Sequence, residues 1–350
     1  MIPPMGAGGH EANGAGPIRI DDPGLGIAEV EAVACRGMGT TLGAEARERV
    51  AASRSLIDAA AGSEASTYGL NTGVGRLAST RIPPDEVREL QLRVVRSHAA
   101  GTGEPYPPEV VRAAILLRAV TLAQGHSGVR PEVIDALLGL LDREVLPHVP
   151  ARGSVGASGD LAPLAHVALT LIGEGEASVG GEMLPAADAL ARAGMAPLVL
   201  EAKEGLALVN GTQFMTAMGA LAVARARRLA TLADLAAALT CESLRGTRDS
   251  FAAPIHELRP HPGQLAAARN LHRAMEGSAI DASSAIAIAS RSRTIAIGWP
   301  WKLPPVRRCG SSGKTSGLSV TAVSSIPITR AACSIESRLA PWTCGAQRSE

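Results

Sequence analysis

The pattern of apolar and polar positions is helical from about residue 45 onward, with apolar residues at three- and four-residue spacing among good helix formers. The segment 108–125 starts with Pro108, which a first helical turn tolerates, and stops at Gly125. Its apolar face carries Val111, Ile115, Leu116 and Leu122. The segment 131–150 repeats this design, so the pattern predicts two consecutive helices.

Two further helices are indicated downstream. Asp160 is a good N-cap, and an apolar face runs from Leu161 until Gly173 stops it. The segment 203–245 is very rich in Ala and Leu with widely spaced charges, which predicts one long buried helix. Strand signals are few and short. We therefore expect a mostly α architecture of long helices packed side by side.

Composition narrows the choice of partners. The chain has 350 residues with 46% hydrophobic and 19% charged, which predicts a globular protein, and its net charge of +1 favours a small molecule over nucleic acid or a membrane surface. Residues 1–17 lack a leader pattern, so we expect a flexible start and a cytoplasmic protein. Five scattered cysteines without a CxxC pair indicate reduced thiols, and His126 and His148 lack metal-ligand spacing.

A change of composition begins near residue 285. All three tryptophans and three of the five cysteines lie in 285–350, and from Ser284 onward nine Lys and Arg residues stand against two acids. Helical periodicity is lost as well. We interpret 285–350 as a divergent basic tail rich in Ser, Pro and Arg, whose abrupt onset fits a disordered arm, a shifted reading frame or a substituted terminus.

The loop GSVGASGD at 153–160 is unusually rich in small residues. A nucleophile elbow requires Gly-x-Ser-x-Gly, and both GASGD and GHSGV lack the last glycine. Neither GxxxxGK[ST] nor GxGxxG is present at this loop, so a phosphate cradle has little support. For an isolated GASGD, a plain glycine-rich turn capped by Asp160 is the commonest interpretation.

One chemical reaction uses every residue type in this loop. If the backbone nitrogen of Gly159 attacks the carbonyl carbon of Ala157, a five-membered ring closes, and dehydration turns the Ser158 side chain into a methylidene group. Gly159 permits the close approach because it lacks a side chain, and Ser158 carries the hydroxyl that leaves. The product is an electrophile built from the chain itself, and no external cofactor is required.

The extended motif GSVGASGDLAPLAH resembles the signature of the aromatic amino acid ammonia-lyases, and within them that of the histidine ammonia-lyases. In that family Ala-Ser-Gly forms a methylidene-imidazolone prosthetic group. Further motifs stand in the family's order and extend the resemblance over roughly residues 18–283. They are TYGLNTGVG at 67–75, RSHAAGTGEP at 96–105, GHSGVRPEVIDALL at 125–138 and KEGLALVNGTQ at 203–213.

The resemblance implies a long-helix bundle of the aspartase/fumarase type, with an N-terminal mixed region that carries the active-site loops. It implies a homotetramer in which each active site combines residues of three chains. Ala157, Ser158 and Gly159 match the residues that form the electrophile, and Tyr68 matches the family's catalytic base. Asn210 matches the asparagine that hydrogen-bonds the prosthetic group.

His98 stands where the family places a substrate-selecting side chain, and a histidine there indicates L-histidine as the substrate. Structural interpretations exist beside these roles: Tyr68 as a packed loop anchor, Asn210 as a buried hydrogen-bonding residue, and His98 as a satisfied core histidine. His166 lies past Asp160 on the expected helix, and we expect it to order the loop or to pack.

The family's later motifs, a QDxYSLRC segment and a GNFHG-like segment, have no counterpart after residue 284. The resemblance therefore implies that the carboxylate-binding arginine, its neighbouring tyrosine and a later glutamate are missing. We expect the C-terminal helices to be missing too, with the chain truncated or frameshifted. Uncovered Ala- and Leu-rich helix faces would leave it unstable, aggregating or inactive.

Three interpretations stay open. The first is a lyase that converts L-histidine to trans-urocanate and ammonia, or a related lyase or aminomutase acting on another aromatic amino acid. The second is a catalytically incomplete fragment or non-catalytic subunit that keeps the fold. The third is a serine hydrolase that uses Ser158, which is disfavoured because the loop lacks the last glycine of the Gly-x-Ser-x-Gly motif.

Overall fold

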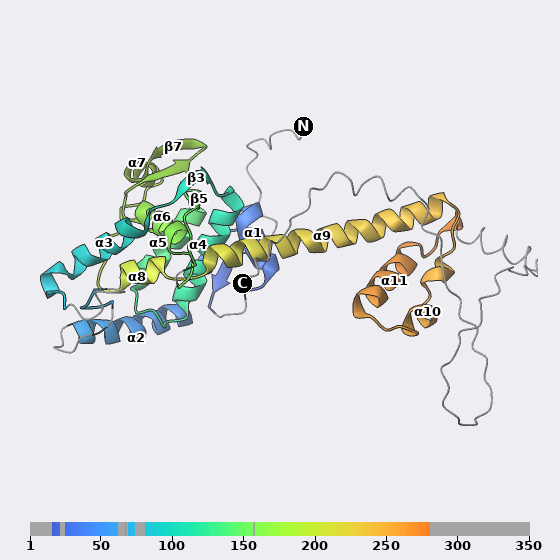
Figure 1. The fold of residues 1–350 in the computed structure, drawn as a ribbon, viewed down its shortest axis with the longest axis horizontal. Helices are drawn as coiled ribbons and strands as arrows, with labels where there is room; N and C mark the ends of the chain where they lie inside the picture. The colour runs from blue at the N-terminus through green and yellow to red at the C-terminus, as the bar shows by residue number, and fades with distance from the viewer. Residues whose placement is uncertain are drawn as a thin grey trace, which may run out of the picture. The chain divides into compact units, whose positions relative to one another are not determined.

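The computed structural model describes residues 16–21, 25–61, 67, 69–73, 81–156 and 158–280, and these are mostly helical, as predicted (Figure 1). The α-helices are α1 (Ile27–Arg36), α2 (Ala44–Ala61), α3 (Val87–His98), α4 (Pro108–Ala123), α5 (Pro131–Asp142), α6 (Leu161–Leu171), α7 (Ala186–Arg192), α8 (Glu204–Val209), α9 (Gln213–Ser243), α10 (Ala253–Glu257) and α11 (Pro262–Ala274). Short 3-10 helices are η2 (Pro84–Glu86) and η3 (Arg248–Phe251). The expected tail at 285–350 and most of the expected flexible start at 1–17 lie outside the described residues.

The strands are short, as expected from the weak strand signals. They are β1 (Ile18–Ile20), β2 (Thr40–Leu42), β3 (Thr102–Pro105), β4 (Leu146–Pro147), β5 (Pro150–Arg152), β6 (Glu176–Val179) and β7 (Glu182–Pro185). β1 pairs with β2 in parallel, β3 pairs with β5 antiparallel, and β4, β6 and β7 form an antiparallel sheet in that order. The β3–β5 pair matters most for function, because β3 follows the segment of His98 and β5 leads directly into the loop 153–160.

Helix α4 forms the centre of the core. It packs against α1, α5 and α9, and apolar side chains on all its sides are buried, which is the pattern of a helix surrounded by others. It begins at Pro108, and Gly125 takes a left-handed conformation just beyond its end, so the predicted boundaries are confirmed. The most completely buried members include Ala113, Ala114, Leu116, Ala119 and Leu122.

The predicted helix at 131–150 is shorter than expected. Helix α5 ends at Asp142, and Glu144 then adopts a left-handed φ of 53°, which interrupts the helical path. Residues Leu146 and Pro147 form β4 instead, where they pair with Ser178 and Ala177 of β6. The apolar pattern continues past Asp142 because this strand is also packed against the core.

The expected single buried helix over 203–245 is wrong in two respects. It is divided at Asn210–Thr212 into α8 and α9, and Asn210 itself has an extended backbone with φ −94° and ψ 104°. Much of α9 is also exposed. Its buried residues lie mainly in its first half and are Gln213, Phe214, Ala217, Leu221, Ala224 and Ala238.

The apolar residues that α9 leaves exposed include Met215, Leu229, Leu232, Leu235 and Leu239. Among the described residues, one stretch, Glu204–Ser243, is long and apolar enough to cross a membrane by length and composition, a test that core helices of soluble proteins also pass. Helix α11 packs on α9, where the side-chain nitrogen of Asn270 donates to Asp234 Oδ2 at 2.8 Å.

Candidate active site

Several described residues of the loop 153–160 are left-handed. Gly153 has a φ of 138°, Gly156 of 69°, and Gly159 of 114°, conformations that side-chain-bearing residues rarely adopt. Ser158 also has a positive φ, 56°, and strain of this kind at a non-glycine residue costs about 1–3 kcal/mol. Its side chain is exposed. The loop therefore presents Ser158 outward on a strained backbone.

Asp160 stands at the N-cap position of α6, as predicted, but its side chain makes no capping bond there. The carboxylate instead reaches α9, where Oδ2 accepts a hydrogen bond from the backbone N–H of Met215 at 2.9 Å, and Oδ1 accepts from the Ser154 hydroxyl at 3.2 Å. A carboxylate is stabilised at a helix N-terminus by the exposed N–H groups. Asp160 thus ties the loop to the first turn of α9.

The loop lies directly against the break between α8 and α9. The backbone N–H of Asp160 donates to the Gly211 carbonyl oxygen at 2.6 Å. A Cβ added at Gly159 would overlap the same oxygen, so Gly159 is required there by space as well as by backbone conformation. Asn210, at the end of α8, is exposed rather than buried. The structure therefore brings Gly159 and Asp160, next to Ser158, into contact with Gly211, next to Asn210, over 50 residues away in the chain.

His98 is the last residue of α3, and its ring is half-buried. Its Nδ1 lies 2.7 Å from the Val94 carbonyl oxygen, and because a carbonyl oxygen only accepts, Nδ1 donates its proton there. The segment after it approaches the loop, because a Cβ added at Gly153 would lie 3.0 Å from the Gly101 Cα. His98 therefore stands three residues before a contact with the loop that carries Ser158.

His166 holds the segment that follows His98, and the expectation that it orders the loop 153–160 itself stays a prediction. Its Nε2 accepts a hydrogen bond from the Gly101 backbone N–H at 3.1 Å. Burial, followed by the nearby His148, lowers the pKa of His166 below its usual value of about 6.5. The ring is thus held neutral, in the form that can accept from Gly101.

Of the two tyrosines, the structure describes Tyr106. Its ring packs on Phe214 with centroids 5.0 Å apart, and burial followed by the charge of Asp160 raises its pKa. A phenol with a raised pKa is a poorer base at neutral pH. Tyr68 and Ala157 lie outside the described residues, so their roles stay predictions.

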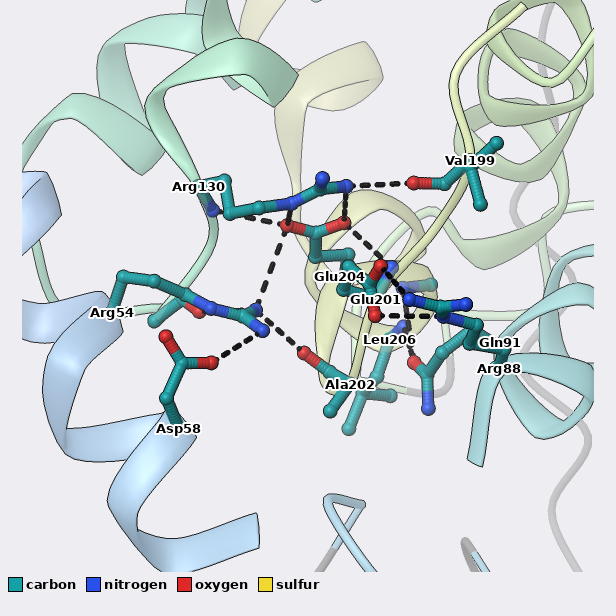
Figure 2. A network of polar contacts seen from close by, with 12 residues as sticks. Arg54, Asp58, Arg88, Gln91, Arg130, Val199, Glu201, Ala202, Glu204 and Leu206 are labelled. Carbon is teal, nitrogen blue, oxygen red and sulfur yellow. Dashed lines mark hydrogen bonds and ion pairs between the residues drawn. The ribbon is translucent and has the colours of Figure 1, made fainter. Parts of the chain in front are cut away.

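Two charged residues that hold α8, Glu204 and Arg118, were not predicted from the sequence to have a role. Figure 2 shows the first, Glu204, whose side chain is fully buried between two arginines. Arg130 donates to it from its backbone N–H at 3.0 Å and from Nε and Nη2 at 2.8 Å, and Arg54 Nη1 lies 3.6 Å away. The backbone N–H of Glu201 donates to Glu204 Oε2 at 2.8 Å. Two arginines and two backbone donors therefore neutralise and satisfy this carboxylate.

The same end of α8 is capped by Gln91 from α3 (Figure 2). The side-chain oxygen of Gln91 accepts from the backbone N–H of Gly205 at 3.0 Å and of Leu206 at 3.4 Å, two of the groups that a helix start leaves unpaired. A Cβ at Gly205 would lie 2.6 Å from the Gln91 carbonyl oxygen, so the helices touch backbone to backbone. The start of α8 is thereby anchored to α3.

The second residue is Arg118 of α4, which is 3% exposed. It donates to the carbonyl oxygens of Ala207 and Asn210 at the end of α8, and to Gln213 Oε1 at the start of α9. A signal for it existed in the sequence, since it is a charged residue inside an otherwise apolar helical run. Its partners lie about 90 residues away, so the sequence pattern does not identify them.

Comparison with known proteins places this arrangement in a family. A family model described as aromatic amino acid lyase matches residues 25–294. The chain belongs to the aromatic amino acid lyase family. It is 56% identical over 264 residues to a histidine ammonia-lyase of Sorangium cellulosum, and 55% identical over 266 residues to one of Gloeobacter violaceus.

The alignments cover 75% and 76% of this chain but 51% and 52% of those relatives, so the chain spans about half their length. Among solved structures, a histidine ammonia-lyase from Trypanosoma cruzi is similar with a TM-score of 0.69 at 38% identity, covering 79% of this chain and 54% of that one. A tyrosine aminomutase from Streptomyces globisporus is similar with a TM-score of 0.72 at 35% identity, covering 83% and 55%. The predicted fold class is thus confirmed.

Proposed function

We propose that this chain is the part of an ammonia-lyase that carries the reactive loop, and that the enzyme eliminates ammonia from L-histidine to give trans-urocanate. One observation carries the proposal: Gly159 and Asp160, which follow Ser158, lie against Gly211, which follows Asn210, in a chain of the aromatic amino acid lyase family. The identity of over half the matched positions to histidine ammonia-lyases supports L-histidine among the aromatic amino acids.

The described residues fit a prosthetic group formed from Ala157, Ser158 and Gly159. Gly159 lacks the side chain that would hinder ring closure, and the Gly211 carbonyl leaves no space for a larger residue. Ser158, already strained and exposed, carries the β-hydroxyl that ring formation eliminates. The methylidene-imidazolone group supplies the electrophile that activates the substrate amine as a leaving group.

The other predicted residues supply the remaining functions. Tyr68 accepts the β-proton of the substrate, for which its pKa must fall from about 10 or its own proton must pass to a neighbour. Asn210 donates its side-chain amide toward the loop and stabilises negative charge there. His98 contacts the substrate ring through Nε2, because Nδ1 is committed to the Val94 carbonyl.

Assembly belongs to the same proposal. The exposed apolar residues of α9, which include Leu229, Leu232 and Leu239, form a surface that a second long helix would cover in a homotetramer. The residues of the expected family site that have no counterpart here would come from a longer chain, because identical partner subunits lack them too. This part of the proposal rests on the uncovered face and on the family, since the structure contains one chain.

The test is the intact mass of the purified protein, followed by urocanate absorbance. Ring formation removes two water molecules, and the Ser158→Ala variant, which has no hydroxyl to lose, should keep at least one of them. We expect the unsubstituted chain to show the two-water loss, and we expect urocanate from L-histidine once a longer chain supplies the site residues that have no counterpart here. Product from L-tyrosine but not L-histidine would reassign the substrate, and an unmodified mass would refute the reactive loop.

A further inference from the structure

Arg118 is a cation buried among backbone carbonyls rather than carboxylates. Its Nη1 donates to the Asn210 carbonyl oxygen at 2.9 Å and to Gln213 Oε1 at 3.1 Å, and its Nη2 donates to the Ala207 carbonyl oxygen. No carboxylate pairs with it in the described part of the chain, and its Nε has no acceptor there. Burial lowers its pKa to about 10, which leaves it protonated at neutral pH. A full positive charge is therefore kept at the end of α8.

That position has a physical use. The last carbonyl groups of a helix lack partners within it and carry a partial negative charge, so a cation there both satisfies and attracts them. Helix α8 spans only Glu204–Val209, too short to hold its own shape. Arg118 supplies from α4 the contacts that stop α8 at Asn210 and turn the chain toward α9.

The turn is held on its other side as well. The Gln213 side chain receives the Arg118 bond at Oε1 and donates from Nε2 to the Thr121 hydroxyl at 3.0 Å. Arg118 and Thr121 are three residues apart on α4, so they lie on one face of that helix. A Cβ added at Gly211 would overlap both Gln213 Oε1 and Arg118 Nη1. The backbone of the turn thus lies directly on this pair of side chains.

We propose that Arg118 is a positioning residue: by holding the Asn210 carbonyl it sets where Gly211 meets Gly159 and Asp160 of the loop. This rests on the proposed function for its catalytic consequence. The structural consequence stands apart from it, because the Gly211 carbonyl accepts from the Asp160 N–H whether or not a ring forms. If the bonds of Arg118 are lost, we expect the hydrogen bond between the Asp160 N–H and the Gly211 carbonyl to weaken, although Arg118 takes no part in that bond.

The test compares Arg118→Lys with Arg112→Lys. Arg112 lies on the same helix and also donates to a backbone carbonyl, that of Val33 at 3.3 Å. Val33 belongs to α1 and not to the loop or to the turn between α8 and α9, so Arg112 serves as the control. Lysine keeps the charge and loses the fork that reaches several acceptors. Hydrogen exchange by mass spectrometry on the full chain then follows the segments 158–161 and 209–214.

In Arg118→Lys we expect faster hydrogen exchange in both segments. In Arg112→Lys we expect the exchange rates of both segments to stay unchanged. We also expect Arg118→Lys to slow the two-water mass loss and to lower kcat by about 10- to 100-fold with little change in KM, as misplacement of a reacting group does. Unchanged exchange at 158–161, or ring formation at the unsubstituted rate, would overturn the positioning role. If the unsubstituted protein never loses water but hydrogen exchange still differs between Arg118→Lys and Arg112→Lys, the positioning role of Arg118 is supported. Only the proposed function is then refuted.

Discussion

Replacement of Glu204 by glutamine tests whether the buried charge cluster holds α8. Glutamine keeps an oxygen for the Arg130 backbone N–H and Nε. Its amide nitrogen, however, replaces Oε2, which accepts from Arg130 Nη2 and from the Glu201 N–H at 2.8 Å each. The Arg130 Nη2 and the Glu201 N–H then face another donor. Arg130 also loses its counter-charge, whereas Arg54 keeps its ion pair with Asp58 at 2.7 Å.

The magnitude follows from these contacts. Each lost bond to a charged group is worth about 1.5–3 kcal/mol, and removal of one partner of a buried pair costs about 3–5 kcal/mol. The side chains of Arg130 and Arg54 are 28% and 11% exposed, so water recovers part of the loss. We therefore expect the lower end, about 3 kcal/mol of unfolding free energy.

Urea unfolding followed by circular dichroism measures this loss. With a urea dependence of about 3 kcal/mol per molar, the midpoint of Glu204→Gln should fall by about 1 M. The matched control is Glu182→Gln, which breaks a pair with Arg192 in which both side chains are more than half exposed. That change should cost less than about 0.5 kcal/mol. A Glu204→Gln midpoint no lower than the control's would show that the cluster does not stabilise the fold.

Two further outcomes can be measured. Because the pKa of His166 is lowered in the folded state, the unfolded state binds more protons between that lowered pKa and about 6.5, so stability should fall as pH drops through this window. His166→Gln, which can still accept from Gly101, should show a smaller acid slope, and equal slopes would exclude His166 as a cause. Gly159→Ala should cost more than about 2 kcal/mol by overlap with the Gly211 carbonyl. Gly156→Ala, with a positive φ but open space around it, should cost about 1 kcal/mol, and equal losses would contradict the steric argument.

The sequence predicted the elements whose signals are local. Helix α4 begins and ends where Pro108 and Gly125 indicate, and α6 begins after Asp160 and ends before Gly173. The helical class and the resemblance to the ammonia-lyases are likewise confirmed by the family match. These features depend on spacing, caps and a long contiguous motif, all of which are visible within a few turns of chain.

The division of 203–245 was missed although Asn210 and Gly211 are residues that favour turns. The Ala- and Leu-rich flanks suggested a continuous helix, and the contact that stops it comes from Arg118 on another helix. Asp160 shows the same limit, because its predicted capping role moved from α6 to the N-terminus of α9. The position of Asp160 before α6 could be predicted from neighbouring residues, but the partner of its carboxylate, the Met215 N–H, lies 55 residues away in the chain.

The sequence by itself thus determined the family and the helical class, and the roles that it indicates for Ala157, Ser158 and Gly159 of the loop and for Tyr68 stay predictions. Only the tertiary structure decided that the loop meets the α8–α9 turn, and that Arg118 and Glu204 hold α8 at its two ends. The physical reason is that a motif records which residue types are present at short spacing. A buried charge is instead stabilised by whatever donors and acceptors the fold brings to it, and here these lie about 70–95 residues away along the chain.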